Sequence, residues 1–168
     1  MPHDLLTDRR QFLFAASGFA LALAAGPGLA LAAADPYANS PWRKMTNAEW
    51  RKKLPPAVYN ILREEGTEAP GSSPLLKEHR KGQFVCAGCA LPLFESKWKF
   101  ESGTGWPSFY DVIPANVGRK SDHALAEERT EYHCARCLGH QGHVFRDGPP
   151  PTGLRYCNDG LGLKFVPA

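Results

Sequence analysis

The sequence has few cysteines, no internal repeat and no strongly basic stretch. Its 168 residues include five cysteines, an odd number, so a framework of paired disulfides cannot account for all of them. The formal net charge is only +3, and no dense stripe of Lys and Arg marks a nucleic-acid-binding surface. No unit of about 20 to 50 residues recurs, which argues against repeat architectures. Because 43% of the residues are hydrophobic and 11% are aromatic, low-complexity disorder is excluded as well.

The N-terminal segment lacks charge after a pair of arginines. Arg9 and Arg10 precede an Ala- and Leu-rich stretch, residues 11–34, that contains no charged residue. This pattern resembles a twin-arginine export signal with Ala-x-Ala cleavage near residue 34. We therefore expect residues 1–34 to be a signal peptide, and the mature protein to be periplasmic and free of the membrane. The alternative is an uncleaved membrane anchor, although Gly26-Pro27-Gly28 interrupts such a helix.

The rest of the chain has the length of one domain, for which we expect a monomer. We expect a linker over residues 35–44 and the folded domain over residues 45–168. Thr46 and Glu49 have the spacing of a capping box, so a short helix should begin there and end before Pro55. A second helix is expected from Ala57 to Glu65, with Gly66 as its C-terminal stop.

After Lys81 the pattern changes to short apolar runs separated by Gly, Pro, Asn and Asp. Such punctuation predicts short antiparallel strands rather than helices alternating with a parallel sheet. The sequence therefore predicts a mainly β fold with a short N-terminal helical pair. The runs are Gln83–Cys86, Leu91–Phe94, Trp98–Phe100, Asp111–Ile113, Leu125–Ala126, Glu131–Cys134, Gly142–Phe145 and Gly162–Val166.

Four of the cysteines form two C-x-x-C motifs, Cys86 with Cys89 and Cys134 with Cys137. Each such turn can direct two thiolates at one ion, and two turns complete a tetrahedral zinc site. Disulfides are the competing interpretation for an exported protein. A bridge within one C-x-x-C closes a very small loop and gains little entropy, so structural zinc is favoured. A single motif acting as a redox dithiol remains a further alternative.

The fifth cysteine, Cys157, is then left for another use. Arg155 lies two residues before it, and on a strand these positions share one face. A guanidinium beside the sulfur would favour the thiolate, whereas a buried, inert thiol is the alternative.

Two further segments carry side chains suited to a binding pocket. Trp106 lies in a Gly-rich turn. Its side chain either packs in the core or forms an aromatic wall that binds a small apolar group. His140 and His143 lie three apart, and the zinc motifs leave both free for acid–base chemistry.

Taken together, these motifs resemble the methionine-R-sulfoxide reductases of the B type. The resemblance extends over residues 45–167 in the expected order. Its matching pieces are the two C-x-x-C motifs, Ser102–Phe109, Gly139–Phe145, Asp147–Pro149, Thr152–Cys157 and Leu163–Phe165. It implies a fold of two twisted antiparallel sheets (a β-tent) with one structural Zn2+ far from the catalytic pocket.

The resemblance also implies a reaction, the reduction of free or peptidyl methionine-R-sulfoxide to methionine. Cys157 corresponds to the nucleophile, which attacks the sulfoxide sulfur and becomes a sulfenic acid. His140 and His143 correspond to the pocket histidines that assist the oxygen, and Arg155 to the arginine that stabilises the thiolate. Trp106 corresponds to the aromatic that receives the substrate methyl group.

The remaining correspondences concern the pocket wall and two departures from the family pattern. Phe145 corresponds to a hydrophobic pocket residue. Thr104 stands where many relatives have a resolving cysteine, so an outside thiol, a thioredoxin-like protein or a small thiol, should reduce the sulfenic acid. Asp159 stands where many relatives have a substrate-pocket Asn, and an acidic group there should raise the pKa of Cys157 or reorganise pocket water.

Two other function classes are compatible with the same residues. A non-catalytic zinc module could bind a partner through Trp106 and the basic run Arg51-Lys52-Lys53. A thiol oxidoreductase could use one C-x-x-C as its redox pair. Accessibility of Cys157 to alkylation and metal content distinguish these classes from the reductase.

Overall fold

The computed structural model describes residues 35–168, which form one compact unit. The predicted signal peptide lies outside the described residues. Within residues 35–168, none of the helices has the length and apolar character needed to cross a membrane.

Three short helices open the described chain: α1 (Pro41–Lys44), α2 (Asn47–Lys53) and α3 (Pro56–Glu64). The capping box predicted at Thr46 is present, because its side chain accepts from the amide of Glu49 and the Glu49 carboxylate accepts from the amide of Thr46. The segment expected as a linker, 35–44, contains α1 and is fastened to the body by Arg43, which donates to the carbonyl of Ala135.

The second helix ends differently from the expectation. Glu65, not Gly66, adopts the left-handed conformation, with a φ of 54°. The amide of Gly66 then donates to the carbonyl of Asn60 at 3.0 Å. A Cβ at Gly66 would meet the end of the exposed Asn60 side chain, which would have to turn away.

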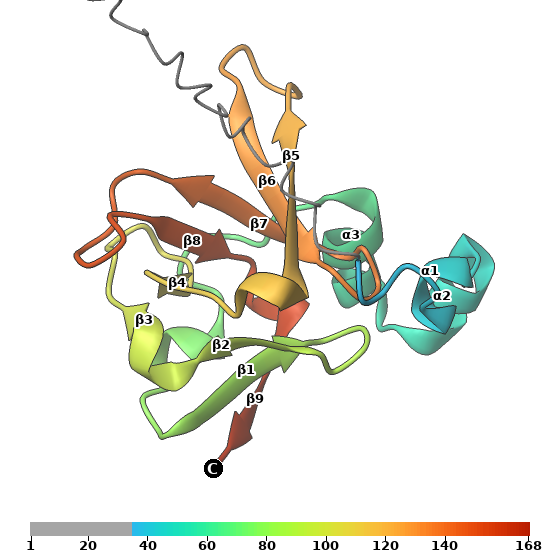
Figure 1. The fold of residues 1–168 in the computed structure, drawn as a ribbon, viewed down its shortest axis with the longest axis horizontal. Helices are drawn as coiled ribbons and strands as arrows, with labels where there is room; N and C mark the ends of the chain where they lie inside the picture. Colours follow the sequence, from blue (N-terminus) through green and yellow to red (C-terminus); the bar gives the residue numbers. More distant parts are fainter. Residues whose placement is uncertain (1–34) are drawn as a thin grey trace, which may run out of the picture. The chain divides into compact units, whose positions relative to one another are not determined.

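Within residues 35–168, nine strands form two sheets, and both sheets are antiparallel, as the resemblance implies (Figure 1). The smaller sheet has the order β2-β1-β9 and the larger β3-β4-β8-β7-β6-β5. The strand bounds are β1 (Gly82–Cys86), β2 (Pro92–Glu95), β3 (Lys99–Phe100), β4 (Ser108–Phe109), β5 (Val117–Asp122), β6 (Arg129–Cys134), β7 (His140–Phe145), β8 (Arg155–Asn158) and β9 (Leu163–Pro167).

Two of the expected strands are wrong, and three strands, β4, β5 and β8, are not among the expected runs. Asp111–Ile113 is irregular, and Leu125–Ala126 belongs to the loop between β5 and β6, where Leu125 is 60% exposed. The polar strand β5 lacks an apolar pattern because it is the edge strand of its sheet and its middle residues are exposed.

The core lies between the two sheets and is built from aromatic side chains. Phe94 of β2 stacks on Phe109 of β4 with ring centroids 4.0 Å apart, and Phe84 of β1 meets Phe109 edge-on at 4.9 Å. Tyr132 and Tyr156 of the larger sheet pack edge-on at 5.3 Å. The helix α3 packs against β7 and against the short 3-10 helix η4 (Gly160–Gly162), which follows β8. These contacts hold β7 and β8, the strands that carry the predicted chemistry.

Candidate active site and metal centre

A pocket of ≈ 140 Å³ opens at Cys157 of β8. β8 lies between β4 and β7, and the strand register places Ser108 on one side of Cys157 and His143 on the other. The pocket is lined by Thr67, Trp106, Arg129, Gly142, His143, Phe145, Cys157, Asn158 and Asp159. Most of the predicted catalytic and substrate-binding residues therefore meet here, although they come from distant parts of the chain.

The Cys157 thiol is half-buried, and its surroundings act on its pKa in opposite directions. Burial raises the pKa of Cys157 above its ordinary value, and the negative charge of Asp159 acts in the same sense. Arg155 and the Thr104 hydroxyl favour the thiolate and oppose this shift, but burial outweighs them. Cys157 is consequently a thiol at neutral pH until a base takes its proton.

Arg155 lies outside the pocket lining, and two neighbouring side chains hold its guanidinium in place. Its guanidinium donates to both carboxylate oxygens of Asp147, at 2.9 and 2.8 Å. It also lies over the Phe145 ring, 4.3 Å from the centroid, and Phe145 is its cross-strand neighbour on β7. This bidentate pair and the ring fix the positive charge near Cys157.

His143 faces the pocket and is anchored by a carboxylate. Its Nε2 lies 2.7 Å from Oδ2 of Asp122, an oxygen that also accepts from Arg129 at 2.6 Å. The pKa of Asp122 lies well below its usual range, because the Ala124 amide and then His143 and Arg129 stabilise its anion. Burial lowers the pKa of His143, and Asp122 only partly offsets this, so His143 is neutral at neutral pH.

His140 is not part of the pocket lining and lies buried behind Asp159. Its Nδ1 is 2.9 Å from Oε1 of Glu131, whose other oxygen lies 3.1 Å from Nδ1 of His133. Burial alone would raise the pKa of Glu131, but the bonds with His133 and His140 dominate and lower it to about 2. The second nitrogen of His140, Nε2, lies 3.9 Å from Oδ2 of Asp159.

Asp159 is held at the pocket by the segment that follows α3. Its Oδ1 accepts from the amide of Glu68 at 3.0 Å, and the carbonyl of Glu68 accepts from the indole of Trp106 at 3.1 Å. The Glu68 carboxylate in turn accepts from the amides of Gly160 and Leu161. Burial raises the pKa of Asp159 to about 6. The acidic side chain at this position is therefore built into the pocket wall.

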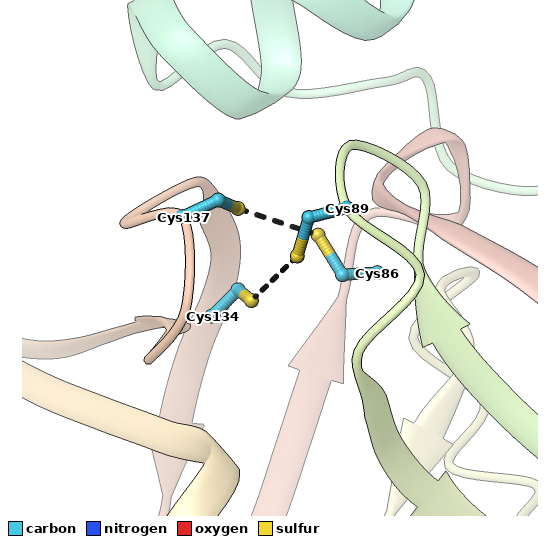
Figure 2. A group of neighbouring side chains, drawn as sticks. All are labelled: Cys86, Cys89, Cys134 and Cys137. Carbon is cyan, nitrogen blue, oxygen red and sulfur yellow. Dashed lines mark hydrogen bonds between the residues drawn. The ribbon is translucent and has the colours of Figure 1, made fainter. Parts of the chain in front are cut away.

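The four remaining cysteines converge at a second place, where two turns face each other (Figure 2). Their sulfur atoms all lie within 4.8 Å of one another, and all four are buried. The Cys86–Cys137 and Cys89–Cys134 sulfurs are 3.6 and 3.5 Å apart, close to the roughly 3.8 Å edge of a tetrahedron with zinc–sulfur bonds of about 2.3 Å. All five cysteines are free. Both of these sulfur–sulfur contacts join one motif to the other, so the arrangement suits a shared metal ion better than two separate redox pairs.

The four thiols act on one another, and neighbouring polar groups connect the cluster to the pocket. Hydrogen bonds from Cys134 and Cys137 lower the pKa of Cys89, and Arg136 adds to the effect at 3.4 Å. Hydrogen bonds within the cluster raise the pKa of Cys86 and Cys137. The side-chain amide of Gln141 donates to the Cys86 sulfur at 3.5 Å, and the backbone carbonyl of Gln141 accepts from the backbone amide of Asp159 at 2.9 Å. The four-cysteine cluster thus supports β7 and, through it, the end of β8.

Comparison with known proteins decides the family. The model of the SelR domain matches residues 54–167. This chain belongs to the SelR family. The peptide methionine sulfoxide reductase MsrB of Thiobacillus denitrificans is 50% identical over 116 residues, which cover 68% of this chain and 88% of that protein. MsrB of Methanosarcina barkeri is 52% identical over 115 residues, covering 68% of this chain and 81% of that protein.

Several pocket and supporting residues of this SelR domain were not singled out from the sequence. Glu131 and Asp122 sit on β6 and β5, and only the strand register brings them to His140 and His143. Glu68 lies far from β8 in the sequence and reaches Asp159 through the fold. Neither spacing nor residue type marks such partners, because Asp and Glu are abundant on every protein surface.

Proposed function

We propose that this protein reduces methionine-R-sulfoxide, free or within a peptide, to methionine. The observation that supports this most is the pocket, where the one cysteine outside the metal cluster stands beside His143 and between aromatic side chains. Relatives at about half identity carry the name peptide methionine sulfoxide reductase. The enzyme class is then an oxidoreductase that acts on a sulfur group with a thiol partner.

The proposed chemistry moves one oxygen atom from the substrate to Cys157. The Cys157 sulfur attacks the sulfoxide sulfur, the substrate's sulfur–oxygen bond breaks, and Cys157 becomes a sulfenic acid while the thioether is released. Trp106 and Phe145 form the apolar wall for the substrate methyl group. His143 lines the pocket and would face the oxygen of the sulfoxide. His140 lies outside the pocket lining, with its Nε2 3.9 Å from Oδ2 of Asp159. Arg155 stabilises the thiolate.

Recycling of the sulfenic acid requires a thiol from outside the chain. The other four cysteines are buried in the metal cluster, and the Thr104 hydroxyl interacts with the Cys157 sulfur from the turn that precedes Trp106. Thr104 is held in place by the Ser102 hydroxyl at 2.8 Å. A thioredoxin-like protein or a small thiol is therefore the proposed reductant, since it can reach the half-buried sulfur through the pocket mouth.

Zinc is the proposed metal of the four-cysteine cluster. Four buried sulfur ligands in a near-tetrahedral arrangement match the structural zinc sites of proteins, which leave no position open for substrate. The ion would join the turn after β1 to the turn after β6 and so stabilise the fold. It would take no part in the reaction at Cys157.

A stereospecific assay tests the proposal. The mature protein, residues 35–168, should reduce the R epimer of a methionine sulfoxide derivative in the presence of dithiothreitol or thioredoxin and leave the S epimer unchanged. The Cys157→Ser variant should lose turnover while still binding one zinc per chain. Failure of the wild type on both epimers, with Cys157 inert to iodoacetamide, would favour a zinc-binding interaction module. Oxidised C-x-x-C motifs without zinc would favour a thiol oxidoreductase.

The same proposal includes export to the periplasm, supported by the twin arginine and the uncharged stretch that follows it. Cell fractionation of the full chain should find the shortened protein in the periplasm. A variant with Arg9→Lys and Arg10→Lys should stay in the cytoplasm at full length. Recovery of full-length wild-type protein in the membrane fraction would instead support an uncleaved anchor.

A further inference from the structure

The pocket at Cys157 holds only the end of the substrate side chain. Its volume of ≈ 140 Å³ is well below the ~300–1,000 Å³ of pockets that enclose a whole small ligand. The sulfoxide sulfur carries an oxygen, a methyl group and the rest of the side chain, and the proposed chemistry places the first two beside His143 and Trp106. The third substituent leads out of the pocket, so the main-chain atoms of the substrate lie at its rim.

Arg129 lines this pocket from β6. The strand register places Glu131 of β6 opposite His143 of β7, and His143 opposite Cys157 of β8. Because side chains two residues apart on a strand share a face, Arg129 lies on the same face of the sheet as these three residues. Two strand spacings, about 10 Å, separate β6 from β8. A group bound by Arg129 therefore lies to one side of the reacting sulfur rather than at it.

The guanidinium of Arg129 has hydrogen-bond donors that no protein group uses. A guanidinium offers five N–H groups and stays positively charged. Among residues 35–168, the Arg129 side chain makes one hydrogen bond, from Nη2 to Oδ2 of Asp122 at 2.6 Å. Its Nε is buried without an acceptor, whereas Nη1, which has no acceptor in this part of the chain either, is not buried. With 29% of the side chain exposed, Arg129 can donate to a molecule at the pocket rim.

The charge of Arg129 selects an oxygen as its partner. Of the residues that line the pocket, Arg129 alone carries a permanent positive charge. Such a donor forms its strongest hydrogen bonds with carboxylate and carbonyl oxygens. Every methionine-sulfoxide residue carries one of these oxygens on its main chain, separated from the sulfur by the side-chain carbons. In the free amino acid the oxygen belongs to a carboxylate, and within a protein it belongs to a peptide carbonyl.

We propose that Arg129 is a specificity-determining residue that binds the main-chain carbonyl or carboxylate oxygen of the methionine-sulfoxide residue. This inference rests on the proposed reductase function and names the part of the substrate that is recognised outside the sulfoxide group. Arg129 also acts on the site itself, since it shares Oδ2 of Asp122 with His143 and its charge lowers the pKa of His143. That second effect does not depend on the main chain of the substrate, so a comparison of substrates separates the two.

The experiment follows the loss of the free Cys157 thiol in the metal-loaded protein without reductant, with three methyl sulfoxides of the same spatial configuration. N-acetylmethionine-R-sulfoxide offers a carboxylate, its N-methylamide offers a neutral carbonyl, and methyl butyl sulfoxide has neither. The measured quantity is the ratio of the second-order rate constant of each of the first two to that of methyl butyl sulfoxide. In Arg129→Met this ratio should fall about tenfold, because a hydrogen bond from a charged donor is lost.

Arg51→Met is the matched control, because it removes an arginine of α2 whose side chain is 65% exposed and which does not line the pocket. It should leave all three rate constants unchanged. Zinc content and the circular dichroism spectrum report whether each variant is folded. If Arg129→Met does not fold, Arg129→Lys replaces it, since lysine keeps the charge beside Asp122 but lacks the planar fork of donors, and the ratio should again fall.

A ratio that falls for both the carboxylate and the amide supports binding of the main-chain carbonyl in proteins, and one that falls for the carboxylate alone supports binding of the free amino acid. An unchanged ratio overturns the assignment. Equal losses with all three sulfoxides would make Arg129 a positioning residue that acts through Asp122 and His143. Equal wild-type rates with all three would also refute main-chain recognition while leaving the reductase function intact. If the wild type oxidises Cys157 with none of them, the proposed function itself fails.

Discussion

Replacing Glu131 by glutamine tests the arrangement on which the histidine chemistry depends. The Glu131 side chain is only 3% exposed and its carboxylate accepts from two rings, those of His133 and His140. Glutamine keeps the shape but offers one oxygen and an NH2 group, which would face a ring N–H. One buried donor then stays unpaired unless a histidine changes its tautomer.

The magnitude follows from the pKa of Glu131. A fall from the ordinary 4.5 to about 2 corresponds to about 3 kcal/mol of folding free energy. The cost of a buried unpaired group, about 1–3 kcal/mol, agrees with this figure. For a domain of this size, Glu131→Gln should therefore unfold roughly 10 °C below wild type.

The sign of the pH dependence is fixed by the direction of the shift. Because the pKa is lower in the folded state, the stabilisation is fully present above pH 4.5 and is lost as pH falls from 4.5 toward 2. The difference between wild type and Glu131→Gln should thus be constant from pH 6 to 8. Urea unfolding of the zinc-loaded proteins over that range measures it.

The control is Glu64→Gln, which removes a carboxylate whose side chain is 46% exposed and whose partner Arg51 is also exposed, so stability should change by less than about 0.5 kcal/mol. A Glu131→Gln variant within about 1 kcal/mol of wild type at pH 7 would refute an ionised Glu131.

Three further predictions concern the strands and the metal. Gly142→Ala places a Cβ on the Cys157 carbonyl oxygen at a φ of 145°, so it should lower the free energy of unfolding strongly. The control is Gly153→Ala, at a φ of 67° with open space around it, which should cost ~1 kcal/mol, several times less. Thermal unfolding compares the two variants. Arg155→Met removes the charge that favours the thiolate, so the pH midpoint of Cys157 alkylation should move to higher pH; an unchanged midpoint would contradict the role given to Arg155. Cys134→Ser, or zinc removal by a chelator, should abolish cooperative unfolding, and a chelated protein with unchanged unfolding would show that the cluster is not structural.

The sequence predicted the convergence of the four cysteines best, because the geometry of each C-x-x-C turn is local. Each C-x-x-C turn brings its own two sulfurs together, and strand pairing then needs only to bring the two turns face to face. The strands were predicted where Gly and Pro punctuate apolar runs. The strand Val117–Asp122 was not predicted, because an edge strand with exposed residues does not need apolar side chains. The strand predicted at Leu125 is wrong, because a single apolar residue in a loop does not have to be buried.

The pocket was predicted only in part. Trp106, His143, Phe145, Cys157 and Asp159 line one pocket, whereas the predicted residues His140 and Arg155 lie outside the lining. The lining residues that were not predicted are Thr67, Arg129, Gly142 and Asn158. The residue type tells which acid or base is present, whereas the tautomer of a histidine and the pKa of a side chain depend on partners that lie far away in the chain. The carboxylates that orient the histidines become visible only through strand pairing.

The surroundings of Cys157 explain why its resting form is the thiol. Burial and the charge of Asp159 raise the pKa of Cys157, and together they outweigh Arg155 and Thr104, which favour the thiolate. Because a thiolate, not a thiol, is the reactive form, this burial protects Cys157 from unwanted oxidation. Arg155, held by both carboxylate oxygens of Asp147, keeps a positive charge close to the sulfur for the moment when the thiol ionises.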